Sequence, residues 1–326
     1  MSDAWQNVLT DAWTELSLAQ AATRLYRTKL ISTNIPLDIF AAIRAVDDAP
    51  CVSLETSVPS GALFEVGGMR LSVAPGERGP LLVLSLEDHN RRDLFTNICA
   101  DVVAAAIEAD PVDALAQFFS RLDAWRQFLR DRRSGLSREE AVGLLGELIV
   151  MEQLLASDAH LQTVWEAPDD GLHDFLRNGH ALEVKTSLGP SSNVRIANLD
   201  QLEPSGLARL DLLHVRLIEA PDGRSIHDLI MSISSRLPDE VARRVFGNAL
   251  LRRGLMPDDD VTRSTPRVKL RAIDGYTVTE DFPRLVRAAV PAAITDANYT
   301  LDLRALVTFA ADTIVVVEAF IQGAAS

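Results

Sequence analysis

Two acidic residues and a lysine fall on one face of a predicted β-hairpin. The segment at 172–187 reads LHDFLRNGHALEVKTS. Its Asn-Gly pair at 178–179 is typical of a type I′ turn, because both central residues of that turn need a positive φ. With this pair as the loop, Asp174 lies opposite Glu183 on the neighbouring strand. Because side chains alternate along a strand, Lys185 shares the face of Glu183.

This arrangement favours a metal site. Like charges directly opposite each other destabilise a sheet, so an Asp–Glu pair beside a lysine is explained best by a divalent cation between the carboxylates. Asp174, Glu183 and the Val184 carbonyl would be ligands suited to phosphodiester hydrolysis, and Lys185 would orient or deprotonate the attacking water. The alternative is a solvent-exposed hairpin with scattered charges. The same register pairs Arg177 with His180, Leu176 with Ala181 and Phe175 with Leu182.

A second aspartate competes for the role of the first carboxylate. Pro168-Asp169 is a literal Pro-Asp pair 14 residues before Glu183. The sequence PDDG, however, is typical of a type I turn. Asp174 is therefore favoured.

The histidines and other motifs narrow the chemistry. His173 alternates away from Asp174, so we expect it on the side of Phe175, as a packed or hydrogen-bonded histidine rather than a ligand. H-x-x-H, HNH and C-x-x-C spacings do not occur, which disfavours zinc chemistry. The G-x-x-x-x-G-K-[ST] motif does not occur either, so any ATP-driven translocation would need a partner.

A largely apolar helix precedes the hairpin. It begins with a capping-box pattern in which Ser137 is the N-cap and Glu140 is the third helical residue. Gly143 and Gly146 each cost about 1 kcal/mol relative to Ala, which suggests that backbone or ligand approaches closely there. Glu147 is costly to bury in such a helix unless it is paired or bound to a cation. The alternative is that Glu147 lies on a narrow solvent-exposed face of the helix.

The hairpin residues resemble the active site of the PD-(D/E)XK nuclease superfamily, with Glu183-Val184-Lys185 as E-x-K and Asp174 as the other carboxylate. A wider set of segments resembles a bacterial family known only as PD-(D/E)XK motif proteins. The resemblance covers roughly the second two thirds of the chain well and the first third loosely. The segments that carry it are GLLGELIVMEQLL at 143–155, Trp165, HDF at 173–175, EVKTS at 183–187, IANLDQL at 196–202, YTVTEDFPRL and VPAAITDANYTLDL.

The resemblance implies a DNA endonuclease of a restriction or anti-phage system that uses Mg²⁺, with Mn²⁺ able to substitute. It implies that Glu147 is a helix glutamate directed at the metal, so that the catalytic set is Glu147, Asp174, Glu183 and Lys185. Gln201 matches the family's Gln-Leu pair and would face the substrate or a metal-bound water. An exposed helical glutamine is an equal alternative.

The expected fold is α/β, with a PD-(D/E)XK (restriction-endonuclease-like) core, an N-terminal β-rich domain and a C-terminal α+β region. A chain of 326 residues is too long for one typical core. The predicted parts are a helix plus small antiparallel β domain at 1–89, a helical connector at 90–136, the core at 137–240 and the C-terminal region at 241–326. The predicted elements are helices at 4–28, 90–130, 138–155 and 225–237, short strands at 37–86, and strands at 210–220, 276–280, 301–309 and 313–321.

Charge is unevenly distributed. A net charge of −14 argues against a protein that coats nucleic acid nonspecifically, because phosphate neutralisation supplies most of that affinity. Two stretches are nevertheless basic: 121–138 holds six Arg against two Asp, and 241–271 holds seven Arg and one Lys against three Asp. They are either solvated helix faces or contacts to a phosphate backbone. In the second case Arg132, Arg133 and Arg138 are candidate substrate contacts.

The sequence also indicates location and partners. The first residues carry no apolar run of signal-peptide length, and no segment approaches a membrane span. Cys51 and Cys99 are expected to be buried free thiols in a reducing cytoplasm. Expected partners are DNA and other defence proteins such as a helicase/ATPase or a methyltransferase, with a homo-oligomer left open and no membrane.

Two functional hypotheses remain. The first is a Mg²⁺-dependent DNA endonuclease, and the second is a catalytically silent nuclease-fold scaffold or DNA-binding subunit of a defence complex. The presence of Glu147, Asp174, Glu183 and Lys185 together favours the first, because a degraded site is expected to lose the lysine or one acid. Cleavage of RNA, or action only inside a complex, also stays open.

Overall fold

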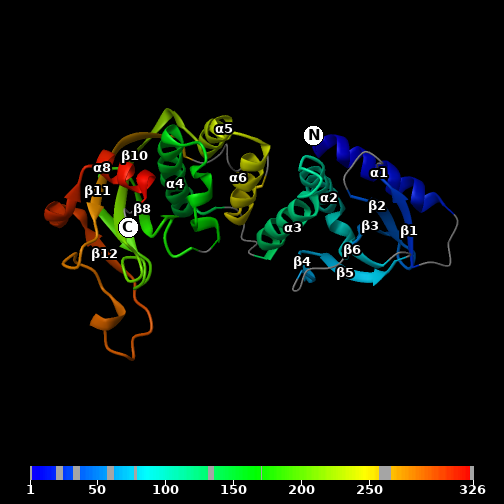
Figure 1. The fold of residues 1–326 in the computed structure, drawn as a ribbon, viewed down its shortest axis with the longest axis horizontal. Coiled ribbons are helices and arrows are strands. Elements are labelled where there is room, and N and C mark those ends of the chain that lie inside the picture. The colour runs from blue at the N-terminus through cyan, green and yellow to red at the C-terminus, as the bar shows by residue number, and fades with distance from the viewer. Residues whose placement is uncertain are drawn as a thin grey trace. The chain divides into compact units, whose positions relative to one another are not determined.

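The computed structural model of the chain divides into two compact units, Met1–Arg132 and Arg133–Ser326, which are described separately (Figure 1). The predicted division into four parts is finer than these two units and stays a prediction. Within the part of the chain that the structure describes, no helix is long and apolar enough to cross a membrane. The described residues are 2–19, 25–31, 37–56, 62–76, 79–130, 136–169, 171–256 and 266–323.

The first unit is a six-stranded antiparallel sheet with three helices. The strand order is β1-β2-β3-β6-β5-β4. Helix α1 ends at Leu18 and packs against β1, β2 and α2 (Figure 1). The buried Trp13 indole stacks on Phe95 and donates a hydrogen bond to the Cys51 carbonyl at 2.8 Å. Cys51 and Cys99 are buried and free, as predicted. The bounds are α1 Ser2–Leu18, β1 Tyr26–Leu30, β2 Ile39–Arg44, β3 Ala49–Glu55, β4 Phe64–Val66, β5 Met69–Pro75, β6 Pro80–Leu86, a 3₁₀ turn His89–Arg91, α2 Arg92–Ile107 and α3 Ala114–Arg130.

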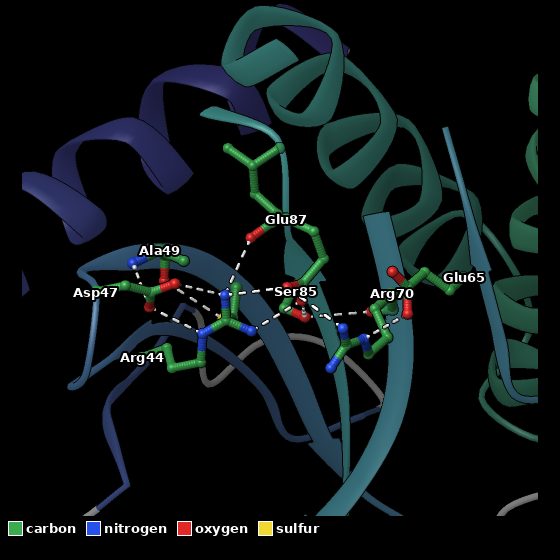
Figure 2. Close-up of polar contacts among 9 residues, drawn as sticks. Arg44, Asp47, Ala49, Glu65, Arg70, Ser85 and Glu87 are labelled. Atoms are coloured by element: carbon green, nitrogen blue, oxygen red, sulfur yellow. Dashed lines mark hydrogen bonds and ion pairs between the residues drawn. The ribbon is translucent and has the colours of Figure 1, made fainter. Parts of the chain in front are cut away.

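A polar network ties strands of this sheet together. Figure 2 shows Arg44, the last residue of β2, donating to Asp47 and, at 2.8 Å, to Glu87 just beyond β6. Glu87 also accepts from Ser85 at 2.6 Å, and Arg70 of β5 pairs with Glu65 of β4 at 3.0 Å. Because each charge in the network has an opposite partner, we interpret it as a cross-link that holds the strands in register.

The second unit is built on a mixed five-stranded sheet with the order β13-β11-β10-β8-β7. Strands β8 and β10 are parallel, and the other neighbours are antiparallel. Strands β9 and β12 form a separate antiparallel ribbon. The bounds are α4 Arg138–Ser157, β7 Phe175–Arg177, β8 His180–Leu188, β9 Asn193–Ile196, β10 Arg209–Arg224, α5 Ile226–Arg236, α6 Glu240–Arg252, β11 Val268–Thr277, β12 Tyr299–Asp302, β13 Ala310–Ala311 and α8 Thr313–Gln322, with 3₁₀ helices at Leu161–Val164, Ala167–Asp169, Arg287–Ala289 and Leu303–Phe309.

The two faces of this sheet have different coverings. Leu182 and Val184 of β8 belong to the core shared with helices α4, α5, α6 and α8. Ala181 belongs to the opposite core, which includes residues of the β9–β12 ribbon. Because side chains alternate along a strand, Glu183 and Lys185 lie on the ribbon side of the sheet. This mixed α/β architecture agrees with the predicted fold class, including the β-rich N-terminal region.

Two predicted strands near the C-terminus are wrong. Of the strand predicted at 301–309, only the first two residues lie in β12, and Leu303–Phe309 forms a 3₁₀ helix. The segment at 313–321 forms helix α8 rather than a strand. Asp312 caps the helix by accepting a hydrogen bond from the Ile314 amide, and Val316 and Phe320, four residues apart, are fully buried. Tertiary packing of this helical stripe outweighs the β propensity of a run of valines.

Helix α4 approaches β8 closely at one glycine. The predicted capping box of Ser137 and Glu140 is present at its start. A Cβ on Gly146 would lie 1.9 Å from Thr186 Oγ1 and within 3.1 Å of the Cβ and Cγ2 atoms, so rotation of the threonine cannot relieve the clash. The close approach predicted for Gly146 is thus confirmed. At Gly143 no described atom lies within 4 Å of such a Cβ, so the close backbone approach predicted there is wrong, whereas the approach of a ligand stays a prediction.

These two glycines give a matched test of the packing. We expect Gly146→Ala to lower the free energy of unfolding by about 1–3 kcal/mol, because it overpacks the helix–strand contact. Gly143→Ala should raise it by up to about 1 kcal/mol, because Ala has the higher helix propensity and no neighbour to displace. Denaturant unfolding of both variants measures the difference, and equal effects would contradict this packing.

Candidate active site

The hairpin that carries the acidic residues has the predicted register. The φ angles at 178–179 are 48° and 77°, both positive as a type I′ turn requires. Local turn chemistry therefore sets which residues of β7 and β8 face each other. The observed pairs are Arg177 with His180, Leu176 with Ala181 and Phe175 with Leu182.

Asp174 sits just before this ladder. The ladder ends at Phe175, so Asp174 has no ladder partner, and its position directly opposite Glu183 stays a prediction. Its Oδ2 accepts a hydrogen bond from the Val184 amide at 2.7 Å, and its carbonyl accepts one from the Glu166 amide at 2.9 Å. The Asp174 carboxylate is thereby held against the peptide that links Glu183 to Val184.

Glu183, Lys185 and Gln201 form a connected group. Lys185 Nζ lies 2.7 Å from Glu183 Oε1 and donates to Gln201 Oε1 at 3.3 Å. The same Gln201 oxygen accepts from the Ala197 amide at 2.8 Å. The structure therefore brings Gln201 to Lys185, in a turn after β9, and Gln201 fixes the position of the ammonium group.

Glu147 is buried near the same charges. Its carboxylate accepts hydrogen bonds from Trp165 Nε1 at 3.0 Å and from Arg253 Nη2 at 2.6 Å. Arg253 lies 106 residues further along the chain, and no local sequence signal connects the two. The charges of Glu183 and Lys185 also act on Glu147. Glu147 is thus near the acidic group, although its direct partners are Trp165 and Arg253.

The negative charges of Asp174 and Glu147 are poorly compensated by neighbouring positive charges. Burial, and then the charges of Glu183 and Glu147, raise the pKa of Asp174 well above its ordinary value. Burial also raises the pKa of Glu147, in spite of the opposing effects of Arg253 and Trp165. An additional positive charge would favour the ionised form of both carboxyl groups.

The residues fit a cation only in part. Glu183 Oε2 is buried and has no hydrogen-bond partner, so one ligand atom is free for an ion. Across the described ranges, however, no group of three or more His, Cys, Asp or Glu side chains is placed to hold a metal ion. Mg²⁺ is commonly bound by one or two carboxylates and several waters, and Asp174 with Glu183 could supply that number. The Val184 carbonyl stays a predicted ligand.

His173 does not lie where the sequence pattern placed it. Its Nδ1 is 3.8 Å from Glu183 Oε2, whereas we expected the ring on the side of Phe175. The expectation was wrong because strand β7 begins at Phe175, so the alternation of side chains does not extend to position 173.

Other predicted residues lie elsewhere. Arg138 pairs with Glu219 at 2.6 Å, and both side chains are largely exposed. The competing aspartate, Asp169, lies on a 3₁₀ turn and pairs with Arg252 at 2.8 Å. Arg132 and Arg133 lie outside the described residues. The roles of these arginines as substrate contacts remain predictions.

A polar row that the sequence did not reveal continues from Lys185 along the same face. His214 of β10 is the ladder partner of Lys185. Its Nε2 lies 2.9 Å from Ser187 Oγ, and its Nδ1 lies 3.8 Å from Asp274 Oδ2. Asp274 also accepts from Arg216 at 3.1 Å. Burial lowers the pKa of His214 below its ordinary value. This row of polar groups, in which His214 and Ser187 are buried, continues from the acidic group along the sheet.

Tyr299, on strand β12 of the ribbon, lies within electrostatic reach of Lys185. Burial raises the pKa of Tyr299, and the positive charges of Arg284 and Lys185 act against that rise. The sequence offered no signal for this approach, because Tyr299 is more than a hundred residues from Lys185.

One comparison with known proteins gave a match. The model of a family described as "Putative PD-(D/E)XK family member" (DUF4420) matches residues 9–304, which is most of the chain. No curated protein and no solved structure matches the chain.

Proposed function

The chain belongs to this PD-(D/E)XK family, and from that membership we propose that it is a metal-dependent deoxyribonuclease. Family membership supports a nuclease-type function. The metal, the substrate and the biological role are parts of the proposal. The observation that carries it is the group of Asp174, Glu183 and Lys185 on one hairpin, with one buried Glu183 oxygen unpartnered.

The residues would divide the work of phosphodiester hydrolysis. Asp174 and Glu183 would hold Mg²⁺, or Mn²⁺ in its place, with the Val184 carbonyl and Glu147 in support. When bound, such an ion supplies a water of lowered pKa and offsets charge on the phosphate. As an ammonium group, Lys185 would orient the attacking water and stabilise the developing negative charge. Only after it has given up a proton could the neutral amine take up the proton of that water.

Gln201 would act through Lys185. Because its side-chain oxygen accepts from both Lys185 Nζ and the Ala197 amide, it restrains the ammonium group on the substrate side of β8. A restrained donor loses less conformational freedom when the substrate binds. We assign Gln201 a positioning role for that reason.

The wider role follows from the same proposal. DNA is the proposed substrate, in a restriction or anti-phage system in the cytoplasm, and the proposed partners are a helicase/ATPase or a methyltransferase, with a second copy of the chain left open. A net charge of −14 supports dependence on such partners, because an acidic chain has little nonspecific affinity for DNA.

A silent nuclease-fold subunit is the second candidate. It is favoured by the ligand geometry, because no three acidic, histidine or cysteine side chains of the described residues are placed to hold an ion together. It is also favoured by the ion pair that occupies one oxygen of Glu183.

A cleavage assay separates the two candidates. Purified full-length protein is incubated with supercoiled plasmid, single-stranded DNA or RNA, each with Mg²⁺, Mn²⁺ or EDTA. We expect metal-dependent nicking of DNA by the wild type and by Asp169→Asn, and none by Glu183→Gln. Cleavage that Glu183→Gln retains would contradict the site, and cleavage of RNA alone would contradict the proposed substrate. No cleavage of any substrate by the folded wild type would favour the silent subunit.

A further inference from the structure

Two unpartnered polar atoms face each other beside β8. His173 Nδ1 and Glu183 Oε2 are both buried, and neither has a hydrogen-bond partner among the residues that the structure describes. Their side chains are 6% and 2% exposed. Leaving a buried polar atom without a partner costs about 1–3 kcal/mol, so two such atoms next to each other call for a ligand between them.

The loop that presents His173 is fixed by backbone contacts. Gly171 donates to the Glu166 carbonyl at 3.0 Å, and the amides of Glu166 and Ala167 donate to the Asp174 carbonyl. A Cβ on Gly171 would lie 2.5 Å from the Glu166 Cβ, so only glycine fits there. The backbone of His173 is therefore held from both sides.

The separation matches two ligands of one ion. The two atoms are 3.8 Å apart, which is too long for a hydrogen bond. A first-row transition metal lies about 2.1 Å from each nitrogen or oxygen ligand, so two ligands of the same ion are about 3 Å apart at a right angle and about 4 Å apart at a wider angle. An ion between these atoms needs only small adjustments of either side chain.

We propose that His173 is a ligand of the metal ion in this site, together with Glu183, and that its nitrogen makes the site prefer Mn²⁺ to Mg²⁺. The proposal rests on the proposed nuclease function and adds the identity of a ligand and the choice of metal. Mg²⁺ is a hard cation that takes oxygen ligands. A transition-metal ion such as Mn²⁺ accepts an imidazole nitrogen more readily than Mg²⁺ does, so replacing one oxygen ligand by nitrogen lowers the affinity for Mg²⁺ more than the affinity for Mn²⁺. The neutral imidazole binds through Nδ1, with the proton on Nε2.

Pulsed electron paramagnetic resonance of bound Mn²⁺ tests the contact directly and needs no cleavage. Wild-type full-length protein with Mn²⁺ should show coupling to one directly bound ¹⁴N nucleus. Protein labelled with ¹⁵N-histidine should show the ¹⁵N pattern instead. His173→Ala should lose the coupling. His214→Gln, which removes the imidazole next to Lys185 and leaves an amide toward Ser187, should keep it.

Titration calorimetry supplies the second readout. His173→Ala should weaken Mn²⁺ binding at least about tenfold, the smallest effect typical of losing even an outer partner of a metal ligand. Mg²⁺ binding should change less, so the ratio of the two affinities falls. Thermal melts of each variant without metal establish that it is folded.

The outcomes separate this proposal from the proposed function. Mn²⁺ that binds with no nitrogen coupling, or with coupling that persists in His173→Ala, overturns the role of His173 and leaves the nuclease proposal standing. No binding of Mn²⁺ or Mg²⁺ by the folded wild type overturns the metal-dependent function and this proposal with it.

Discussion

Lys185→Ala is expected to lower the rate of metal-dependent cleavage by about a hundredfold to ten-thousandfold, the range typical of losing a positioned proton-transfer group. Lys185 is the ammonium group that lies 2.7 Å from Glu183 Oε1 on the ribbon side of β8. Its removal leaves the attacking water unoriented and the developing charge on the phosphate unopposed. Single-turnover cleavage of a labelled duplex measures the loss.

Metal binding should survive the same substitution. The ammonium group is not a metal ligand, and its loss frees Glu183 Oε1 from an ion pair. We therefore expect Lys185→Ala to bind Mn²⁺ at least as tightly as the wild type in a calorimetric titration. A variant that loses both cleavage and metal binding would show that Lys185 holds the site together rather than acting on the substrate.

Two further variants define the role of the group. Lys185→Arg keeps the positive charge but cannot release a proton near neutral pH. It should recover charge stabilisation without proton transfer and cleave at an intermediate rate. Lys269→Ala is the matched control, because Lys269 is a half-exposed lysine paired with Asp222. Wild-type rates in Lys185→Ala would contradict its place in the mechanism.

Local signals in the sequence predicted the parts of the site that lie close together in the chain. Asn178-Gly179 determined the hairpin register, because its two positive φ angles leave one pairing of β7 with β8. The capping box predicted the start of α4. The unfavourable helix propensity of glycine at position 146 predicted the close approach of Gly146 to β8. In each case the signal comes from one or two residues and concerns only their immediate surroundings in the chain.

Contacts between distant segments were not predictable in the same way. Arg253 reaches Glu147 across 106 residues. Strands β11 and β13 from the C-terminal region complete the sheet of the core, although their sequences gave no sign of their neighbours. Such pairings depend on where whole elements pack, and many partners are compatible with the same local pattern.

The error at His173 has a physical cause. Alternation of side chains holds only inside a strand, and β7 begins at Phe175. Extending the pattern to His173 placed the imidazole on the side of Phe175, whereas its Nδ1 lies near Glu183 Oε2. The backbone there follows a turn fixed by hydrogen bonds to Glu166. The proposed ligands His173 and Asp174 thus lie just outside the strand to which the alternation applies.

The second large effect is expected from metal binding to the folded protein. An ion that binds only the native state adds about 2.7 kcal/mol to the free energy of unfolding when its concentration is about 100 times its dissociation constant. For a unit of this size that moves the melting midpoint by several degrees. Millimolar Mn²⁺ should therefore raise the melting midpoint of the wild type, and Asp174→Asn should reduce the rise because it removes one ligand charge.

The same substitution should stabilise the protein without metal. The pKa of Asp174 is raised by burial and by Glu183 and Glu147, so the ionised carboxylate is disfavoured in the folded state. Because the pKa of Asp174 is higher in the folded protein than in the unfolded chain, the protein is most stable with respect to this group below the unfolded pKa. That contribution to the free energy of unfolding is lost as the pH rises through the pKa of the folded protein. Asn keeps an oxygen for the Val184 amide and carries no charge. Its advantage should be seen at neutral pH and vanish in acid.

The test is specific because Asp174→Asn is expected to raise the melting midpoint without metal and to reduce the rise that Mn²⁺ causes. Asp174→Asn should melt above the wild type without metal and gain less from Mn²⁺. Asp169→Asn, which changes an exposed aspartate paired with Arg252, should do neither. A variant that is stabilised without metal but gains as much as the wild type from Mn²⁺ would mean that Asp174 is a buried repulsive group and not a ligand. Equal melting curves for all three proteins under both conditions would remove the physical basis for a cation at this hairpin.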